Sequence, residues 1–124
     1  MIRILLAEDD AAMRGYICRA LENAGYSVVA VGSGTAALPH LKTEIFDLLL
    51  SDIVMPEMDG IELAQYCNEI SPTTKVMFIT GFAAVTLRAS RDAPHAKMLS
   101  KPFHLRDLVL EVERMFADAV PMRV

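Results

Sequence analysis

The chain has 124 residues, of which 53% are hydrophobic and 23% charged, and its formal net charge at pH 7 is −4. This length fits one hydrophobic core, and the acidic balance argues against nucleic acid as the main partner, because phosphate binding needs a basic face. No apolar stretch approaches the roughly 18 residues of a membrane span, and acidic residues within the first ten positions argue against a signal peptide.

Short continuous apolar runs alternate along the chain with longer segments of helical spacing. The short runs are typical of strands buried on both faces, and they predict strands at Ile2–Ala7, Tyr26–Val31, Phe46–Ser51, Lys75–Thr80 and Lys97–Ser100. The longer segments predict helices at Ala11–Ala24, from residue 33 to about 42, at Gly60–Ile70, from Ala83 to about Ala89, and at Leu105–Ala117. Strict alternation implies an α/β fold with a doubly wound, five-stranded parallel sheet. We expect one domain over 1–124, with an ordered core over about 2–118, a tail over 119–124 and no effector domain.

Two segments fit this pattern poorly. Pro39 lies inside the second predicted helix, past its first turn, and should remove a hydrogen bond and kink or break the helix. The fourth predicted helix is followed by polar residues and Pro94, so we expect it to be short and loosely anchored. A mobile loop and a functional segment are both open interpretations there.

Asp52 follows the apolar run of the third predicted strand, where an acid is costly unless it is used. The next residues contain Pro56 and an Asp59-Gly60 turn, which predicts a loop and leaves Asp52 at a strand tip facing a crevice. A carboxylate in that position can be a metal ligand, a general base or a nucleophile.

Polar residues also end the other strands of the predicted sheet. Glu8-Asp9-Asp10 follows the first strand, Thr80 ends the fourth, and Lys101 follows the fifth. Because working residues gather beyond the carboxyl ends of strands in an open α/β sheet, we expect these tips to meet. Clustered carboxylates raise one another's pKa, and a divalent cation such as Mg²⁺ relieves their repulsion. With a lysine and a hydroxyl nearby, the site suits a phosphoryl group.

Four motifs, each weak alone, occur in order and make the whole chain similar to the CheY-like receiver domain of two-component response regulators. They are Leu5–Asp10, Asp52–Gly60, Ile79–Gly81 and Lys101–Phe103. The resemblance implies a flavodoxin-like (βα)5 sandwich with strand order 2-1-3-4-5. It implies a cytoplasmic phosphoprotein of a phosphorelay, which is no enzyme beyond its own phosphorylation and dephosphorylation. It also implies Mg²⁺ as cofactor and a histidine kinase or histidine phosphotransferase as partner, with no nucleic-acid or membrane partner.

The resemblance assigns roles at the acidic end of the site. Asp52 would be the phosphoryl acceptor. Asp9 would bind Mg²⁺ directly, Glu8 would act through water, and Val54 would supply its backbone carbonyl. We expect Asp10 to be the N-cap of the first helix, although a metal-binding pair of Asp9 and Asp10 is the alternative.

Lys101 and Thr80 receive the remaining roles. Lys101 would pair first with Asp52 and then with the phosphoryl oxygens, and its bond to Pro102 would be cis, as in the family. Thr80 would turn its hydroxyl to a phosphoryl oxygen. Such a bond is worth about 1.5–3 kcal/mol, whereas moving a population from 1:99 to 99:1 takes about 5.5 kcal/mol. Lys101, the cation and the loop after Thr80 must therefore share the switch, or the switch is partial.

The chain departs from the family at three positions near the site. Met98 stands where receivers usually carry Tyr or Phe, so the aromatic movement that accompanies the threonine cannot occur in that form. Met98 either repacks when Thr80 moves or merely fills the surface between helices. Coupling of Thr80 to the surface can instead run through Phe82 or the backbone of 81–91. Val54 and Phe82, two residues after Asp52 and Thr80, are apolar and cannot orient water, so we expect slow hydrolysis of the acyl phosphate.

Without an effector domain, output would come from binding. The stretches Leu21–Tyr26, Met77–Val85 and Ser100–Val109 are similar to the CpdR type of alphaproteobacterial receiver, which implies an adaptor regulating Clp-type AAA+ proteolysis under phosphorelay control. A phosphate shuttle and a chemotaxis-type receiver are the alternatives. A haloacid-dehalogenase-like phosphatase also uses a strand-end aspartate with Mg²⁺, but it needs a second acid where this chain has Val54.

The histidines and cysteines carry no recognisable motif. His40, His95 and His104 are scattered, and we interpret none as a metal ligand or phosphoryl donor, although His104 is a candidate cap of the last helix. Cys18 and Cys67 lack CxxC spacing, which favours reduced core thiols in a cytoplasmic protein.

Overall fold

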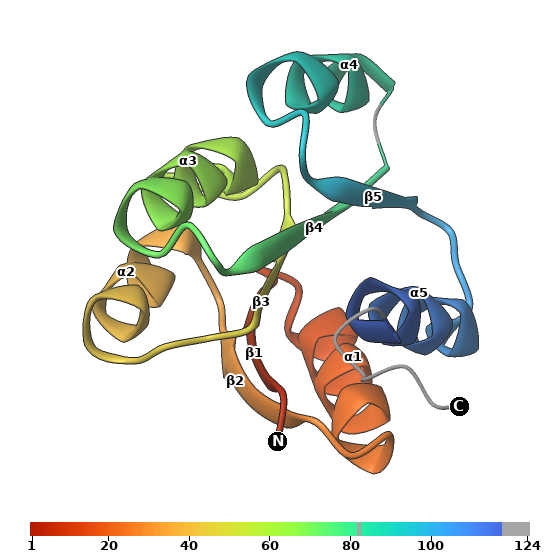
Figure 1. Ribbon diagram of the computed structural model, residues 1–124. Coiled ribbons are helices and arrows are strands. Elements are labelled where there is room, and N and C mark those ends of the chain that lie inside the picture. Colours follow the sequence, from red (N-terminus) through yellow and green to blue (C-terminus); the bar gives the residue numbers. More distant parts are fainter. Residues whose placement is uncertain (82, 118–124) are drawn as a thin grey trace.

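The computed structural model describes residues 1–81 and 83–117 (Figure 1). Five parallel strands form one sheet in the order β2-β1-β3-β4-β5, which confirms the predicted fold class and strand order. The strands are β1 (Arg3–Ala7), β2 (Ser27–Val31), β3 (Leu48–Asp52), β4 (Lys75–Thr80) and β5 (Lys97–Ser100). The helices are α1 (Ala11–Asn23), α2 (Gly34–Thr43), α3 (Gly60–Ile70), α4 (Ala83–Asp92) and α5 (Leu105–Ala117).

Helices cover both faces of the sheet. Figure 1 shows α1 and α5 side by side on one face and α2, α3 and α4 on the other. Alternate strand residues supply the two cores because successive side chains of a strand point to opposite faces. Leu6 and Leu50 pack towards α1 and α5, and Leu5 and Leu49 pack towards α2 and α3. A third, smaller cluster lies where α3 and α4 meet the sheet, and it contains Ile53, Ile61, Ala64, Phe78 and Ala89.

The strand register brings the carboxyl ends of the strands to a common edge. Ala7 of β1 lies beside Ser51 of β3, and Asp52 lies beside Ile79 of β4. Thr80 in turn pairs with Ser100, the last residue of β5. The polar residues at or just beyond these ends are therefore neighbours in space, as the sequence predicted.

The predicted boundaries of α3, β4, β5 and α5 are confirmed, and two others, those of β3 and α4, differ by more than a residue at one end. β3 begins at Leu48 and includes Asp52, because Asp52 continues the ladder with β4. α4 extends to Asp92 rather than ending near Ala89. In its last turn the guanidinium of Arg88 lies 3.9 Å from the carboxylate of Asp92, one turn along the helix, which favours the helical state.

A break of the second helix at Pro39, one of the two outcomes predicted from the sequence, does not occur. α2 runs through Pro39 from Gly34 to Thr43. Its start is capped by Ser33, whose side chain accepts from the amide of Ala36. Burial of apolar side chains before and after the proline, at Ala37 and Leu41, anchors the helix to the sheet and offsets the bond that proline cannot make.

Within the described ranges, no helix combines the length and the apolar character that crossing a membrane requires. Cys67 is buried on the inner face of α3 and Cys18 is half-buried in α1, and both are free thiols. Desolvation by burial raises the pKa of the Cys67 thiol, which lowers its reactivity.

Candidate functional site

Three carboxylates from two adjacent strands meet at the carboxyl edge of the sheet. Glu8 and Asp9 directly follow β1, and Asp52 ends β3. One oxygen from each residue lies within 4.8 Å of the other two. Glu8 is fully buried and Asp52 nearly so, whereas Asp9 is exposed. The cluster is therefore open to solvent on one side and backed by the sheet on the other.

Lys101 reaches into this cluster from the end of β5. Its ammonium donates to Oδ2 of Asp52 at 3.0 Å and approaches Oε1 of Glu8 at 3.5 Å. The backbone amide of Lys101 donates to the carbonyl of Thr80 at 2.7 Å, which aligns the ends of β4 and β5. The Lys101-Pro102 peptide is cis, as the sequence predicted.

Burial changes the protonation of Glu8. The pKa of its carboxyl is raised to about 7, chiefly by desolvation and also by the negative charge of Asp52, while the Asp10 amide and Lys101 act in the opposite direction. The side chain accepts from the Asp10 amide at 3.2 Å. A carboxyl that titrates near neutrality in the absence of a cation marks a place where one more positive charge is favourable.

The Lys101 ammonium experiences opposing influences. Its partial burial lowers the pKa, but the hydrogen bond and charge of Asp52, together with the charge of Glu8, raise it overall. Lys101 is therefore a fixed cation at neutral pH. It neutralises one of the clustered negative charges and leaves a surplus of negative charge for an additional cation.

The chemistry of this donor set fits Mg²⁺. Carboxylate oxygens on one partly exposed edge are the ligands that this hard cation prefers, with room for water. Asp10 is not in the three-carboxylate cluster, and its side chain instead accepts from the amide of Met13 at 3.0 Å as the N-cap of α1. The predicted N-cap is therefore confirmed. Of the two acidic pairs considered from the sequence, only Glu8 with Asp9 converges on Asp52.

The loop between β3 and α3 closes tightly on Asp52. The amide of Val54 donates to Oδ1 of Asp52 at 3.3 Å, and the amide of Gly60 donates to the carbonyl of Ile53 at 2.8 Å. A Cβ on Gly60 would lie 2.2 Å from the carbonyl oxygen of Asp52, so only glycine allows this approach. Both carboxylate oxygens of Asp52 thus have a donor on them, Val54 on one and Lys101 on the other.

The far end of the same loop is held by capping and by α2. Asp59 caps α3 in a reciprocal capping box with Glu62. A Cβ on Gly34, the first residue of α2, would lie 2.7 Å from the carbonyl oxygen of Met58. Glycines in two separate elements, Gly34 and Gly60, therefore make room for this loop.

The residues predicted to report phosphorylation lie at the β4–β5 side of the site. Thr80 is buried at the end of β4, directly after the residue that pairs with Asp52. Met98 of β5 is half-buried and packs on the cluster that includes Phe78 and Ala89. This packing agrees with the interpretation of Met98 as filler between elements. Phe82 lies outside the described residues.

An ion pair between Arg88 and Asp59 was missed by the sequence analysis. The guanidinium of Arg88, in α4, donates to Oδ2 of Asp59, and this contact raises the pKa of the arginine. It joins α4 to the residue that caps α3. The sequence offered only a local partner for Arg88, namely Asp92 one turn later.

The histidines lie away from the cluster. Nδ1 of His40 is 2.8 Å from Oε2 of Glu44, one turn later in the chain. His104 precedes α5, and its backbone carbonyl accepts from the amides of Asp107 and Leu108. The predicted capping by His104 therefore involves its main chain.

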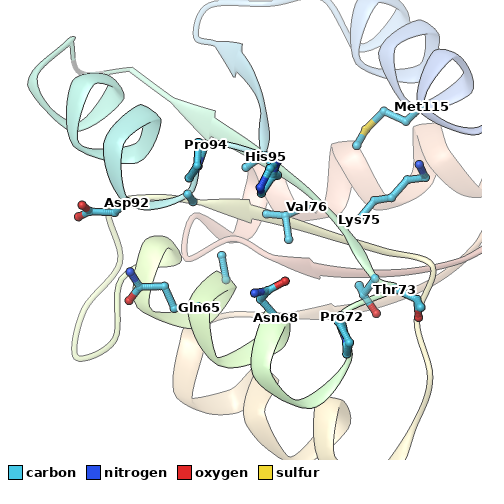
Figure 2. A pocket seen from close by; sticks show the side chains of 14 residues that line it. Gln65, Asn68, Pro72, Thr73, Lys75, Val76, Asp92, Pro94, His95 and Met115 are labelled. Carbon is cyan, nitrogen blue, oxygen red and sulfur yellow. The ribbon is translucent and has the colours of Figure 1, made fainter.

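A cavity of about 500 Å³ lies at the opposite edge of the sheet (Figure 2). It separates α3 from the segment after α4, and its walls include Gln65, Asn68, Lys75 and His95. None of the clustered carboxylates lines it. The acidic cluster and this cavity are therefore separate features of the molecule.

The fold and the acidic edge agree with a single family. The model of the response regulator receiver domain matches residues 4–113, and the chain belongs to this family. It is 61% identical over 120 residues to the response regulator receiver protein CpdR of Brucella abortus (strain 2308), covering 96% of this chain and 100% of that protein.

Solved receiver structures share the architecture. A CheY-like receiver domain protein from Methanospirillum hungatei JF-1 has a TM-score of 0.87 and 28% identity, covering 95% of each chain. The response regulator TrrA from Thermotoga maritima, solved in complex with Mg(2+)-BeF, has a TM-score of 0.83 and 25% identity, covering 93% of this chain and 99% of that one.

Proposed function

We propose that this receiver is a cytoplasmic response regulator whose Asp52 accepts a phosphoryl group from phosphohistidine on a histidine kinase or histidine phosphotransferase. The observation that carries the proposal is the position of Asp52 between the Lys101 ammonium, 3.0 Å away, and the carboxylates of Glu8 and Asp9. This arrangement offers a nucleophilic oxygen, a fixed positive charge and oxygen ligands for a divalent cation.

In the proposed transfer, one carboxylate oxygen of Asp52 attacks phosphorus in line with the departing imidazole nitrogen. The oxygen–phosphorus bond forms as the phosphorus–nitrogen bond breaks, and the electron pair of the broken bond stays on the imidazole. The ammonium of Lys101 donates to Oδ2 of Asp52 before the transfer. It can then donate to the phosphoryl oxygens, where negative charge develops.

Glu8, Asp9, Asp52 and the backbone carbonyl of Val54 would hold Mg²⁺, with Glu8 acting through water. When bound, Mg²⁺ would supply positive charge for the phosphoryl oxygens. Asp9 suits direct coordination because it is exposed, whereas Glu8 is buried behind it. Oε2 of Glu8 already accepts a hydrogen bond from the Asp10 amide. This is consistent with a contact from Glu8 to the cation through water.

Thr80 would act as the switch by turning its hydroxyl to the phosphoryl group. Its burial and its position one residue beyond the partner of Asp52 support this role. Because one charged hydrogen bond is worth about 1.5–3 kcal/mol, the shift of Lys101 from Asp52 to the phosphoryl oxygens must contribute too. Replacing Thr80 by valine should leave phosphorylation intact and weaken phosphorylation-dependent binding.

We expect the acyl phosphate to be long-lived. Val54 is 46% exposed at the mouth of the site and carries no group that could orient an attacking water. Replacing Val54 by a polar residue, and Phe82 likewise, should speed the loss of phosphate measured in a time course. Unchanged lifetimes in both variants would contradict this explanation.

For the output, we propose an adaptor role in Clp-type AAA+ proteolysis, controlled by the phosphorylation of Asp52. The similarity of three stretches to CpdR-type receivers and the 61% identity to the Brucella protein support it. The proposal predicts unequal recovery of the protease by unmodified protein, phosphorylated protein and Asp52→Ala in a pull-down. Equal recovery of partners by all three would favour a phosphate shuttle or phosphorylation-independent binding.

The central experiment is phosphorylation with phosphoramidate and Mg²⁺, followed by mass-spectrometric mapping of the modified residue. We expect modification at Asp52, none in Asp52→Asn, and none in the presence of a chelator. Modification of another residue in the wild-type protein would overturn the proposal. Turnover of a phosphomonoester would instead indicate the phosphatase alternative, which the apolar Val54 disfavours.

A further inference from the structure

Arg14, in the second turn of α1, reaches back over the turn that carries the acidic pair. Its Nη1 donates to the backbone carbonyl of Glu8 at 2.9 Å. That carbonyl belongs to the peptide that joins Glu8 to Asp9. The guanidinium therefore holds the main chain between the two acids and not either carboxylate.

Gly32, at the end of β2, leaves the space that the guanidinium occupies. A Cβ at Gly32 would lie 3.1 Å from Nη1 of Arg14, closer than ordinary contact. Gly32 does not have a positive φ, unlike Gly25, so its backbone conformation does not require glycine. A side chain at Gly32 would therefore press on the guanidinium of Arg14 and shift it.

Other bonds fix the same turn from the opposite side. The amide of Glu8 donates to the carbonyl of Val31 at 3.1 Å, and the Glu8 side chain accepts from the Asp10 amide. These two bonds do not involve the carbonyl of the Glu8–Asp9 peptide. The bond from Arg14 to that carbonyl orients this peptide. The exposed carboxylate of Asp9 depends on the angle of this peptide.

We propose that Arg14 is a positioning residue for the divalent-cation site: it fixes the Glu8–Asp9 peptide so that successive carboxylates converge with Asp52. The inference rests on the proposed function, since it assumes a cation at this cluster. The charge of Arg14 alone would act in the opposite direction, because a guanidinium near the site repels a divalent cation. If Arg14 positions the peptide, its removal weakens Mg²⁺ binding; if Arg14 acts only through its charge, its removal strengthens Mg²⁺ binding.

The test measures Mg²⁺ affinity of the full chain by calorimetry and by the Mg²⁺-dependent shifts of backbone amides. We expect Arg14→Met to weaken Mg²⁺ binding about 10-fold, within the range for partners that orient metal ligands. Arg14→Lys keeps the charge but not the planar fork, so it should weaken binding as well. Unchanged or tighter Mg²⁺ binding in Arg14→Met, with a native circular dichroism spectrum, would overturn the proposal.

A second variant acts on Arg14 without touching the acidic turn. Gly32→Ala should displace the guanidinium and weaken Mg²⁺ binding in the wild-type background, and it should add nothing in Arg14→Met. Additive effects of the two substitutions would contradict the proposal. This variant also provides the test if Arg14→Met does not fold.

The proposed function and this inference fail in different ways. Wild-type protein that binds no Mg²⁺, or that phosphoramidate does not modify at Asp52, would overturn the proposed function. Wild-type protein that binds Mg²⁺ and is modified at Asp52, while Arg14→Met binds Mg²⁺ equally well, would overturn only the role of Arg14.

Discussion

The central strands β1 and β3 and the edge strand β5 hold their functional residues in different ways. β3 is buried along its whole length and β1 along all but its first residue, whereas β5 has no fully buried residue. Asp52 and the acidic pair Glu8 and Asp9 belong to the first region, and Met98 and Lys101 belong to the second. The acidic cluster is thus built on a buried centre, while Met98 and Lys101 lie where local opening costs less.

Replacing a leucine by alanine should reduce the free energy of unfolding far more in β3 than in β5, because only in β3 does it leave a fully buried cavity. Leu50→Ala removes a fully buried side chain from β3, and we expect it to cost about 4 kcal/mol of unfolding free energy. Leu99→Ala makes the same change at a half-buried position of β5 and should cost about 1–2 kcal/mol. Urea unfolding followed by circular dichroism measures both, and equal losses would contradict the contrast.

A methyl group on Gly60 should be the next most damaging change. It would meet the backbone of Asp52, which cannot rotate away as a side chain could, so Gly60→Ala should cost about 3 kcal/mol and impair modification of Asp52. Gly15→Ala is the matched control, because a Cβ there meets nothing within 4 Å in the middle of α1. It should stabilise the protein by up to about 1 kcal/mol.

The buried Glu8 should make the cation-free protein less stable as the pH rises. Its pKa in the folded protein is about 7, whereas in the unfolded chain it is ordinary, near 4.5. The folded state therefore holds an extra proton between these values, so the contribution of Glu8 to stability is present below pH 4.5 and lost by about pH 7. The loss should be about 3 kcal/mol.

Comparing wild-type protein with Glu8→Gln isolates this effect. Urea unfolding at several pH values between 4 and 8, with a chelator present, should show a steeper decline for the wild type than for the variant. Added Mg²⁺ should restore the wild type near pH 7, since a cation favours the ionised carboxylate. Parallel profiles of the two proteins would show that Glu8 titrates normally.

The smallest predicted effect concerns the attachment of α4. Arg88→Met removes the ion pair with Asp59, which is partly exposed, so global stability should change by less than about 1 kcal/mol. Amide exchange within the described part of α4 should nevertheless rise several-fold, because the pair joins this helix to the start of α3. Arg91→Met is the control, as Arg91 is largely exposed and its ion pair among the described residues is with its neighbour Asp92. Equal exchange in the two variants would contradict a role for the Asp59 contact.

Local sequence signals predicted the elements whose ends are set by neighbouring residues. α3 was predicted from Gly60 to Ile70 because an Asp-Gly turn precedes it and Ser71-Pro72 follows it. The error at Pro39 has the opposite origin. Burial of Ala37 and Leu41 against the sheet outweighs a local penalty, and burial is a property of the fold rather than of the segment.

The acidic cluster was predictable because topology alone brings strand ends together. Parallel strands in the observed order must place Glu8, Asp9 and Asp52 at one edge. The contacts of Arg14 and Arg88 were not predictable in this way. Each depends on the reach of one long side chain to a particular atom, the backbone carbonyl of Glu8 for Arg14 and the distant carboxylate of Asp59 for Arg88.

The two close glycine contacts around the β3–α3 loop also bear on protein engineering. The loop fits only because Gly34, far back in the chain, and Gly60, at its own end, both lack a side chain. A graft of residues 53–60 alone onto another scaffold would include Gly60 but not Gly34, so the new scaffold would have to provide the space that Gly34 leaves for Met58. Transferring the β3–α3 loop to another scaffold therefore requires the start of α2 to be transferred with it.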